Sequence, residues 1–398
     1  MPELTKNAAP AQSIQAGQQY MPALTGIRAI AAYMVCIFHY NPLKNFREAS
    51  GWKHFAFSFI NELHVGVTIF FVLSGFLICY RYYGTAVHIT RKWFARYLMN
   101  RVARIYPMYL LITLLTFALT EINPARYELI PYKLSHPLTE RIWVFILNLT
   151  MLKAFFNDYR FTGIAQAWSL TVEECFYLSA PFFMIGIRRS RWAWVVLPVG
   201  TLLFMVGLWQ TIGQLDFHGL FGTLQFMLNF TFFGRCLEFF AGIALAVYVR
   251  KQQHLSNALS RRGPWFTLLG TGFAFICVLA MAAISGPDNS KDTYAGIAIN
   301  NALLPIGVTL LFYGLLVEKS WLRSLLSTKL FDTLGKSSYI FYLIHMGVTN
   351  ILLKTYFVHS TVLQFIALNI ISILLYKFVE SPIHSWLRPK SPVVSTRA

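Results

Sequence analysis

Two side chains capable of acid–base or ion-pair chemistry stand in one apolar stretch, LTGIRAIAAYMVCIFHY, which covers 24–40. Arg28 and His39 are eleven positions apart, close to three helical turns. A helix would place them on one face, about 16 Å apart along its axis. Imidazole takes up and releases protons near neutral pH, and guanidinium binds phosphates or carboxylates. The spacing therefore indicates either two anchoring residues or a functional site.

Further ionisable residues lie inside or at the edges of apolar blocks. A charge near the bilayer centre costs at least about 2.5–3.5 kcal/mol, so such residues usually face the bundle interior and pair or act there. Arg235 and Glu238, three positions apart, fit a structural ion pair as well as a functional one. His345 fits a structural interior histidine better than a second base, with a supporting role left open. The full set is Arg28, His39, Glu173, Glu174, Arg235, Glu238, His345 and Glu380.

Membrane-spanning helices must position these residues, because the composition is that of a polytopic membrane protein. Of the 398 residues, 56% are hydrophobic and only 13% are charged. Eleven apolar blocks approach the length that crosses a bilayer, so the predicted fold is all-α. The blocks cover 24–40, 64–83, 104–121, 141–156, 168–187, 192–210, 224–249, 265–285, 295–317, 338–354 and 360–382.

The charges of the loops determine how many blocks cross. An excess of Lys and Arg marks cytoplasmic loops, which assigns 81–104, 188–191, 250–263 and the tail from Arg388 to the cytoplasm. Two cytoplasmic loops need an even number of crossings between them, yet three blocks separate the first two. Block 141–156 is short and polar in places, so we expect it not to span. The prediction is about ten transmembrane helices with both termini cytoplasmic.

The same pattern sets the domain organisation and excludes several kinds of partner. We expect a polar tail over 1–22, one transmembrane domain over 23–388 and a basic tail over 389–398, with the first helix retained as an anchor. The net charge of +18 lies in loops between apolar blocks, which argues against nucleic acid. The five cysteines are irregularly spaced and suggest neither disulfides nor a metal site. We expect membrane lipids as neighbours, and no metal.

Six stretches stand in order along the chain: LTGIRAIAAYMVCIFHY, GVTIFFVLSGFLI, FARYLMNRVARIYPMYLL, AWSLTVEECFYLSAP, GKSSYIFYLIH and YKFVESP. Together they resemble the membrane acyltransferase-3 family, which includes bacterial O-antigen and Nod-factor O-acetylases. The likeness extends over about 24–388, and the family's first helix carries an arginine and a histidine as Arg28 and His39 stand here. Some members carry a C-terminal soluble domain, whereas this sequence ends ten residues past Arg388, so we expect a stand-alone transmembrane form that acts alone or with a separate partner.

The resemblance implies an integral-membrane O-acyltransferase in a bacterial inner membrane. It would transfer acetyl from cytoplasmic acetyl-CoA to a hydroxyl of a cell-envelope or exported saccharide, free or lipid-linked. His39 would deprotonate the acceptor or carry the acyl group itself. Glu173 or Glu380 would fix the tautomer of His39 if the bundle brings it near. Arg28 would hold donor phosphate or pin a carboxylate.

The arginines after the second apolar block are the expected donor site. Arg101 and Arg104 lie three positions apart on one helix face and form a basic patch with Arg96. Guanidinium grips phosphate bidentately, so the patch suits the phosphates of coenzyme A. Without the resemblance, the same residues fit ordinary positive-inside anchoring.

Trp168 fits an aromatic anchor at the membrane interface.

A membrane transporter of an acylated or anionic small molecule is the competing hypothesis, because buried charges also mark substrate paths. Transporters often show two related halves with broken spans in matching positions. This sequence shows no internal repeat, and no pair of Gly/Pro-interrupted spans occupies matching positions. The sequence therefore favours an enzyme.

Overall fold

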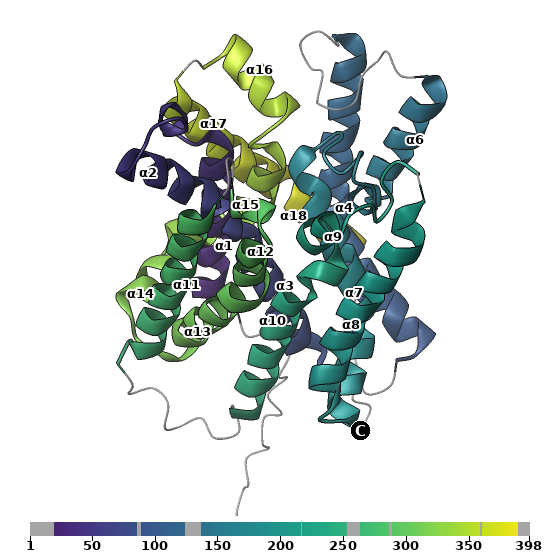
Figure 1. The fold of residues 1–398 in the computed structure, drawn as a ribbon, viewed down its shortest axis with the longest axis vertical. Helices are drawn as coiled ribbons and strands as arrows, with labels where there is room; N and C mark the ends of the chain where they lie inside the picture. Colours follow the sequence, from purple (N-terminus) through teal and green to yellow (C-terminus); the bar gives the residue numbers. More distant parts are fainter. Residues whose placement is uncertain are drawn as a thin grey trace, which may run out of the picture.

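The computed structural model describes residues 20–85, 89–123, 137–215, 217–252, 263–285, 289–358 and 360–388. Across these ranges the regular structure is helical, apart from an isolated bridge between Phe156 and Leu220. The helices stand side by side along the long axis of the molecule (Figure 1). The prediction of an all-α fold is confirmed.

Nine helical segments in the described part of the chain are long and apolar enough to cross a membrane. Some are single helices, and others join two helices end to end. The helices that build them are α1 (Pro22–Tyr40), α2 (Trp52–Asn61) with α3 (Gly66–Tyr82), α4 (Arg91–Ile122), α7 (Trp168–Arg189), α8 (Ala193–Thr211), α9 (Leu224–Phe230) with α10 (Phe232–Gln252), α11 (Trp265–Ile284), α12 (Tyr294–Ala298) with α13 (Leu304–Val317), and α17 (Thr361–Leu375) with α18 (Ser381–Leu387).

The remaining predicted span is divided into two helices. Block 338–354 corresponds to the end of α15 (Lys329–Ile344) and the start of α16 (Val348–Tyr356), neither of which has the length of a span. Gly347 in the break has a φ of 78°, which favours glycine because other side chains are strained there. The break leaves the last carbonyl groups of α15 without helical partners, so other groups must bond to them.

Block 141–156 forms no span, as its polar residues predict. It becomes α6 (Leu138–Leu149), beside α4, followed by the short turn η3 (Lys153–Phe155). Nζ of the buried Lys153 donates to the carbonyl oxygens of Thr162 and Ile164 at 2.5 and 2.6 Å. Burial lowers the pKa of this ammonium to about 7. Lys153 thus organises the loop that leads into α7.

Glycines allow the closest contacts between helices. A Cβ on Gly242 of α10 would lie 2.0 Å from the carbonyl oxygen of Val72 in α3. A Cβ on Gly335 of α15 would lie 2.0 Å from the carbonyl oxygen of Thr25 in α1. Small residues let backbones approach closely, which strengthens the packing that holds helices together in lipid. These contacts join α10 to α3 and α15 to α1, and a Cβ on Gly66 of α3, 2.3 Å from the carbonyl oxygen of Ala31, would meet α1 on another side.

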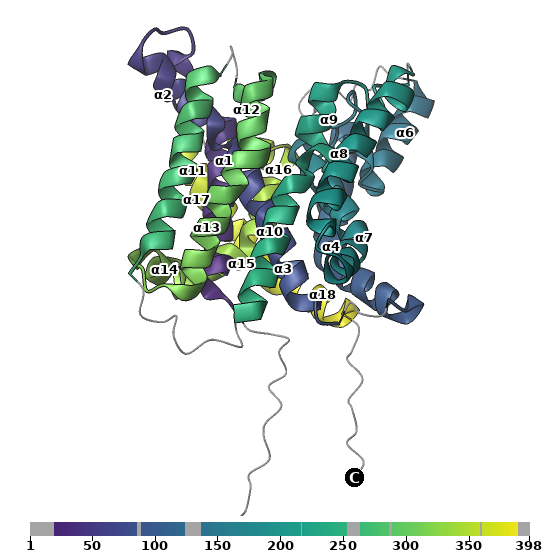
Figure 2. The ribbon, with the colours of Figure 1, turned by 60° about the horizontal axis from the view of Figure 1, so that its bottom comes forward.

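The two ends of the bundle differ in charge. The start of α1, the end of α3, α14 (Trp321–Leu326) and α18 lie at the lower end in Figure 2, whereas α2, α6 and α9 lie at the upper end. At the lower end, Arg188 and Arg250 donate to carbonyl oxygens of Tyr83 and Tyr80 in the last turn of α3. The loops predicted to be cytoplasmic thus share one end, which we call the basic end. We call the other the histidine end.

Candidate active site

His39 forms a hydrogen-bonded pair with His345 at the break in the α15–α16 span. Nδ1 of His39 lies 3.0 Å from Nε2 of His345, and the ring centres are 5.1 Å apart. His39 stands in the last turn of α1, and His345 is the residue at which α15 ends. The position that we expected Glu173 or Glu380 to fill is therefore taken by a second histidine.

The hydrogen bonds of His345 fix the tautomers of both rings in the neutral pair. Nδ1 of His345 lies 2.8 Å from the carbonyl oxygen of Tyr342. A carbonyl oxygen only accepts, so this nitrogen carries the proton and Nε2 of His345 accepts. His39 then donates from Nδ1, and its Nε2 keeps a lone pair. That lone pair is what a general base or a nucleophile needs.

Side chains from α1 and from the turn before α7 hold the helix break in place. The hydroxyl of Tyr40 donates to the carbonyl oxygen of His345 at 2.6 Å. Nε2 of Gln166 donates to the carbonyl oxygens of Tyr342 and Leu343 at 3.0 and 2.8 Å. These bonds satisfy carbonyl groups at the C-terminal end of α15. The imidazole pair is thus held from two directions.

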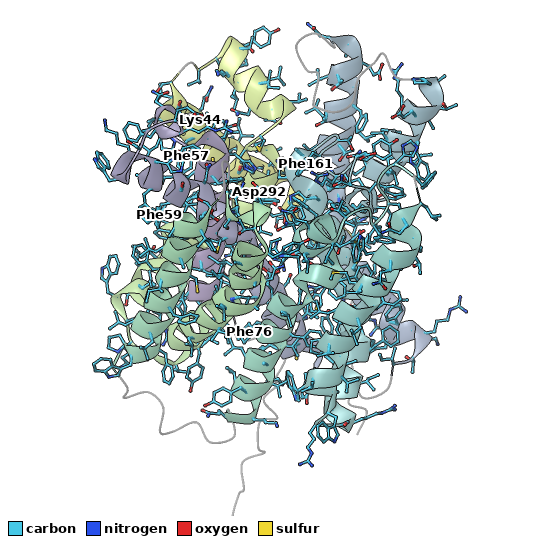
Figure 3. The ribbon with its side chains drawn as sticks, viewed as in Figure 1. Lys44, Phe57, Phe59, Phe76, Phe161 and Asp292 are labelled. Atoms are coloured by element: carbon cyan, nitrogen blue, oxygen red, sulfur yellow. The ribbon has the colours of Figure 1, made fainter. Side chains whose placement is uncertain are left out.

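A cavity of about 750 Å³ adjoins His39 at the histidine end. Its volume lies within the range of small-molecule sites, which are mostly apolar with a few placed polar groups. Figure 3 labels two of its lining residues, Phe161 and Asp292, between the two halves of the bundle. The other residues that matter below are Phe38, Arg160, Gln166, Trp168, Gln225, Phe226, Asn229, Phe230 and Lys291.

Trp168 belongs to this cavity and is not an anchor at the membrane interface, which corrects the sequence-based expectation. Only 7% of its surface is exposed. Its ring centre lies 4.9 Å from that of Phe230, and the guanidinium of Arg235 lies 5.9 Å from its ring. Arg235 forms two hydrogen bonds of 2.7 Å to the carboxylate of Glu238. This buried ion pair lies against the cavity wall at Trp168.

Arg28 lies at the other end of α1, in a small pocket of about 70 Å³ that Arg101, Arg104 and Glu173 also line. Glu173 accepts hydrogen bonds of 2.8 Å from the hydroxyls of Ser74 and Tyr177. The pocket therefore brings Arg28 together with two arginines of α4, far from it in the sequence, and with one carboxylate. Arg28 and His39 share a helix but serve two different sites.

Glu380 also belongs with the arginines. It ends the π-helical turn η10 (Tyr376–Glu380) and interacts electrostatically with Arg104 and Arg28. Its Oε2 atom is buried and accepts no hydrogen bond from the described residues. Both candidate carboxylates thus lie with Arg28, while the charged or titratable groups that act on His39 are His345, Lys291 and Lys44.

The predicted donor residues divide into two groups. Arg101 and Arg104 line the pocket beside Arg28, whereas Arg96 is exposed and lines none of the cavities described here. Arg81 interacts electrostatically with this pair, and Arg388 interacts with Arg81, which enlarges the cluster. Sequence reasoning placed both in cytoplasmic segments but had no signal that they meet. A phosphate-rich ligand finds several guanidinium groups here.

A thin layer of side chains separates the arginine pocket from the cavity. The hydroxyls of Ser169 and Tyr342 lie 2.9 Å apart, and Tyr342 also donates to the carbonyl oxygen of Gln166 at 2.9 Å. The ring of Phe70, which lines the arginine pocket, lies 5.8 Å from that of Tyr342. Gln166 lines the cavity on the other side. A group that passes from one site to the other must cross this layer.

Comparison with known proteins gives the same identification over nearly the whole chain. A family model described as an acyltransferase domain matches residues 21–376. The chain is 28% identical over 394 residues to "Putative peptidoglycan O-acetyltransferase YrhL" of Bacillus subtilis, which covers 92% of this chain and 55% of that protein. It is 24% identical over 392 residues to the peptidoglycan O-acetyltransferase OatA of Listeria monocytogenes. This match covers 92% of this chain and 56% of that protein. The chain spans about half the length of these relatives, and no solved structure matches it.

Proposed function

Since this chain belongs to the acyltransferase-domain family, we propose that it is a membrane O-acyltransferase that uses acetyl-CoA. Acetyl-CoA binds at the basic end, and a hydroxyl of a cell-envelope saccharide receives the acetyl group at the histidine end. The observation that carries this proposal is the His39–His345 pair beside a cavity of about 750 Å³, with His39 on the same helix as Arg28 of the arginine pocket. A bacterial inner membrane is the location that fits a cytoplasmic donor and an envelope acceptor.

The donor is held by its phosphates. Arg101 and Arg104 bind the phosphates of coenzyme A, and Arg28 guides the part of the donor that carries the thioester into the bundle. Glu173, held by the hydroxyls of Ser74 and Tyr177, interacts electrostatically with Arg28 and balances part of its charge. The thioester-bearing part of the donor extends along α1 towards His39, past the layer formed by Ser169 and Tyr342.

Direct transfer is one of two routes that the pair supports. Nε2 of His39 takes the proton of the acceptor hydroxyl while the oxygen attacks the thioester carbonyl carbon. The C–S bond breaks, and the thiolate receives the proton from the imidazolium. His345 keeps the ring oriented throughout by accepting from Nδ1. The products are an O-acetyl ester and free coenzyme A.

An acyl-histidine is the second route. Nε2 of His39 attacks the thioester carbonyl carbon, the C–S bond breaks, and the proton on Nδ1 moves to Nε2 of His345. Transfer of that proton onwards to the thiolate releases coenzyme A. The acceptor hydroxyl then attacks the acyl-imidazole and its proton restores Nδ1–H. This route suits a donor and an acceptor that arrive from opposite ends.

The test is transfer of radiolabelled acetyl from acetyl-CoA to envelope saccharides in membranes that contain equal amounts of each variant. His39→Ala is expected to lower the rate about 10²–10⁴-fold, the usual contribution of a general base. His54→Ala is the matched control, because His54 is a partly exposed histidine that lines no cavity described here and is bonded to the carbonyl oxygen of Arg47. Unchanged transfer by His39→Ala would contradict the proposal.

Donor binding is tested separately. Arg104→Gln is expected to raise the KM for acetyl-CoA about tenfold or more, because a hydrogen bond to a charged group contributes about 1.5–3 kcal/mol. Arg96→Gln removes the same charge from the surface of the same helix and is expected to change this KM less than twofold. If Arg104→Gln and Arg96→Gln raise the KM for acetyl-CoA equally, the donor responds only to the total positive charge of this end and not to a specific contact with Arg104.

A further inference from the structure

The cavity beside His39 contains two cationic side chains that the acyl-transfer chemistry does not use. Lys291 lies in the turn η8 (Ser290–Asp292), with Nζ 5.0 Å from the ring centre of Phe38. Arg160 lies in the loop before α7 and stacks 4.5 Å from the ring of Phe161. Neither cation lies within 4.0 Å of a carboxylate oxygen in the described residues.

The carboxylates near Lys291 leave it unpaired. Glu62 accepts from the backbone N–H of Ser290 at 2.8 Å and from its hydroxyl at 2.6 Å. It therefore fixes the turn that carries Lys291 and does not form an ion pair with it. Asp292 is exposed and also faces the cavity. Lys291 is thus a positioned cation with room for an anionic oxygen.

Neighbouring side chains pre-organise this cation. The amide of Gln225 donates to the carbonyl oxygen of Lys291 at 3.0 Å, and the amide of Asn229 donates to the same oxygen at 3.1 Å. Both amide residues also line the cavity. Because the backbone of Lys291 is already held in place, binding of a ligand costs less conformational entropy.

Two buried polar atoms in the cavity wall lack partners among the described residues. Oε1 of Gln166 accepts no hydrogen bond, although only 3% of the residue is exposed. Its Nε2 is committed to two carbonyl oxygens, which fixes the orientation of the amide. Nε of Arg160 is also buried and donates to nothing. A buried polar group without a partner is costly, so each points to a ligand group that completes it.

From these contacts we propose that the acceptor is an acidic saccharide whose anionic group binds Lys291 and Arg160. One hydroxyl of the same sugar reaches Nε2 of His39, and a second donates to Oε1 of Gln166. The apolar faces of the sugar ring pack against Trp168 and the neighbouring phenylalanines. This inference rests on the proposed function and narrows its acceptor class to sugars with a carboxylate or a phosphate.

The first experiment identifies the charge of the natural product. Membranes with the full chain receive radiolabelled acetyl-CoA, and the labelled saccharides are released and passed over an anion exchanger. We expect the label to be retained. Carbodiimide coupling removes retention if the acidic group is a carboxylate, and mild acid removes it if the group is a sugar phosphate. A labelled saccharide that is neutral overturns this inference, whereas the absence of labelled saccharide overturns the proposed function itself.

The second experiment tests whether Lys291 binds the anionic group of the acceptor. The released saccharide is the substrate whose concentration is varied. Lys291→Gln is expected to raise the acceptor KM about tenfold, the equivalent of about 1.4 kcal/mol, while the KM for acetyl-CoA stays unchanged and shows that the variant is folded. Lys291→Arg keeps the charge and is expected to stay within about threefold of the wild type. Lys44→Gln removes an exposed cation, labelled in Figure 3, at the same end. An equal loss in Lys44→Gln and Lys291→Gln overturns the assignment.

Discussion

His39 is paired with an imidazole, and this choice of partner has chemical consequences. A carboxylate would stabilise a positive ring by its charge, whereas neutral His345 supplies only a hydrogen-bond acceptor. A lasting imidazolium in a buried site without a counter-charge is unfavourable. The proton taken from the acceptor is therefore expected to pass on rapidly to the leaving thiolate. We therefore propose that His345 acts as a positioning residue whose effect is transmitted through His39.

Substitution of His345 tests this role. His345→Phe cannot accept from Nδ1 of His39 and is expected to lower the transfer rate about 10–100-fold, in the range seen when a supporting partner of a catalytic histidine is lost. His345→Gln offers an amide oxygen and is expected to recover part of that loss. Initial rates are compared at saturating acetyl-CoA. If His345→Phe and His345→Gln lower the transfer rate equally, His345 contributes packing volume and no functional hydrogen bond.

The acceptor affinity is expected to depend on pH through Lys291. Burial, with a smaller effect of Arg235, lowers the pKa of the Lys291 ammonium to about 7. The side chain is positive below this pH and neutral above it, so the acceptor KM should rise between pH 6 and pH 9. Other charged or titratable groups that act on Lys291, or are acted on by it, are Glu62, Asp292, His39, His64 and Arg235.

Lys291→Arg provides the control for this pH dependence, because guanidinium stays protonated throughout the range. Its acceptor KM is expected to stay flat between pH 6 and pH 9, while the wild-type value rises several-fold. Acceptor KM values are measured at each pH with the released acidic saccharide. A rise that persists in Lys291→Arg would assign the titration to another group, with His39 the first to consider.

At the scale of elements, the break between α15 and α16 creates the site. A continuous helix would use the carbonyl oxygens of Tyr342 and Leu343 internally, whereas the break frees them for the amide of Gln166. The same break lets the His345 ring turn towards α1. Close packing of α1 against α15, at Gly335, brings the two histidines into contact. Helix packing and helix interruption are therefore both required.

The glycine contact between α3 and α10 is expected to be essential for stability. A Cβ on Gly242 would overlap the backbone of α3, and overpacking of this kind costs about 1–3 kcal/mol. Gly242→Ala should lower the unfolding temperature of the detergent-solubilised protein. Gly200→Ala in α8 is the control, because a Cβ at Gly200 has no neighbour within 4 Å. Equal melting temperatures for the two variants would contradict the importance of this contact.

At the scale of the whole molecule, Arg28 lies near the start of α1 and His39 in its last turn, so the arginine cluster and the histidine pair lie towards opposite ends of one bundle. This separation suits a reaction that takes its donor on one side of the membrane and its acceptor on the other. The layer of Ser169 and Tyr342 lies between the two sites.

The orientation is testable by cysteine labelling. Four native cysteines are buried and the fifth, Cys175, is partly buried, so background labelling should be low. Lys44→Cys at the histidine end is expected to react with an impermeant maleimide in intact cells. Arg189→Cys at the basic end should react only after permeabilisation. The reverse pattern would place the arginine cluster outside the cell and remove it from cytoplasmic acetyl-CoA.

The sequence alone predicted most of the helical segments and the gathering of the basic loops at one end of the bundle. A span in lipid must satisfy its own backbone hydrogen bonds, so an apolar block of sufficient length becomes a helix whatever its neighbours are. Loop charge and the parity of crossings identified 141–156 as non-spanning, and α6 confirms this. The positions of Arg28 and His39 on one helix also follow from local periodicity.

Only the tertiary structure decided which residues meet. His39 and His345 are 306 positions apart, and their contact depends on how α1 packs against α15 and on where α15 ends. Glu173 and Glu380 lie beside Arg28 for the same reason. Arg160 and Lys291 stand in loops, where no periodic pattern marks them, and the cavity gathers them. Local sequence sets which segments are helical, but the partners within a site depend on packing between distant helices.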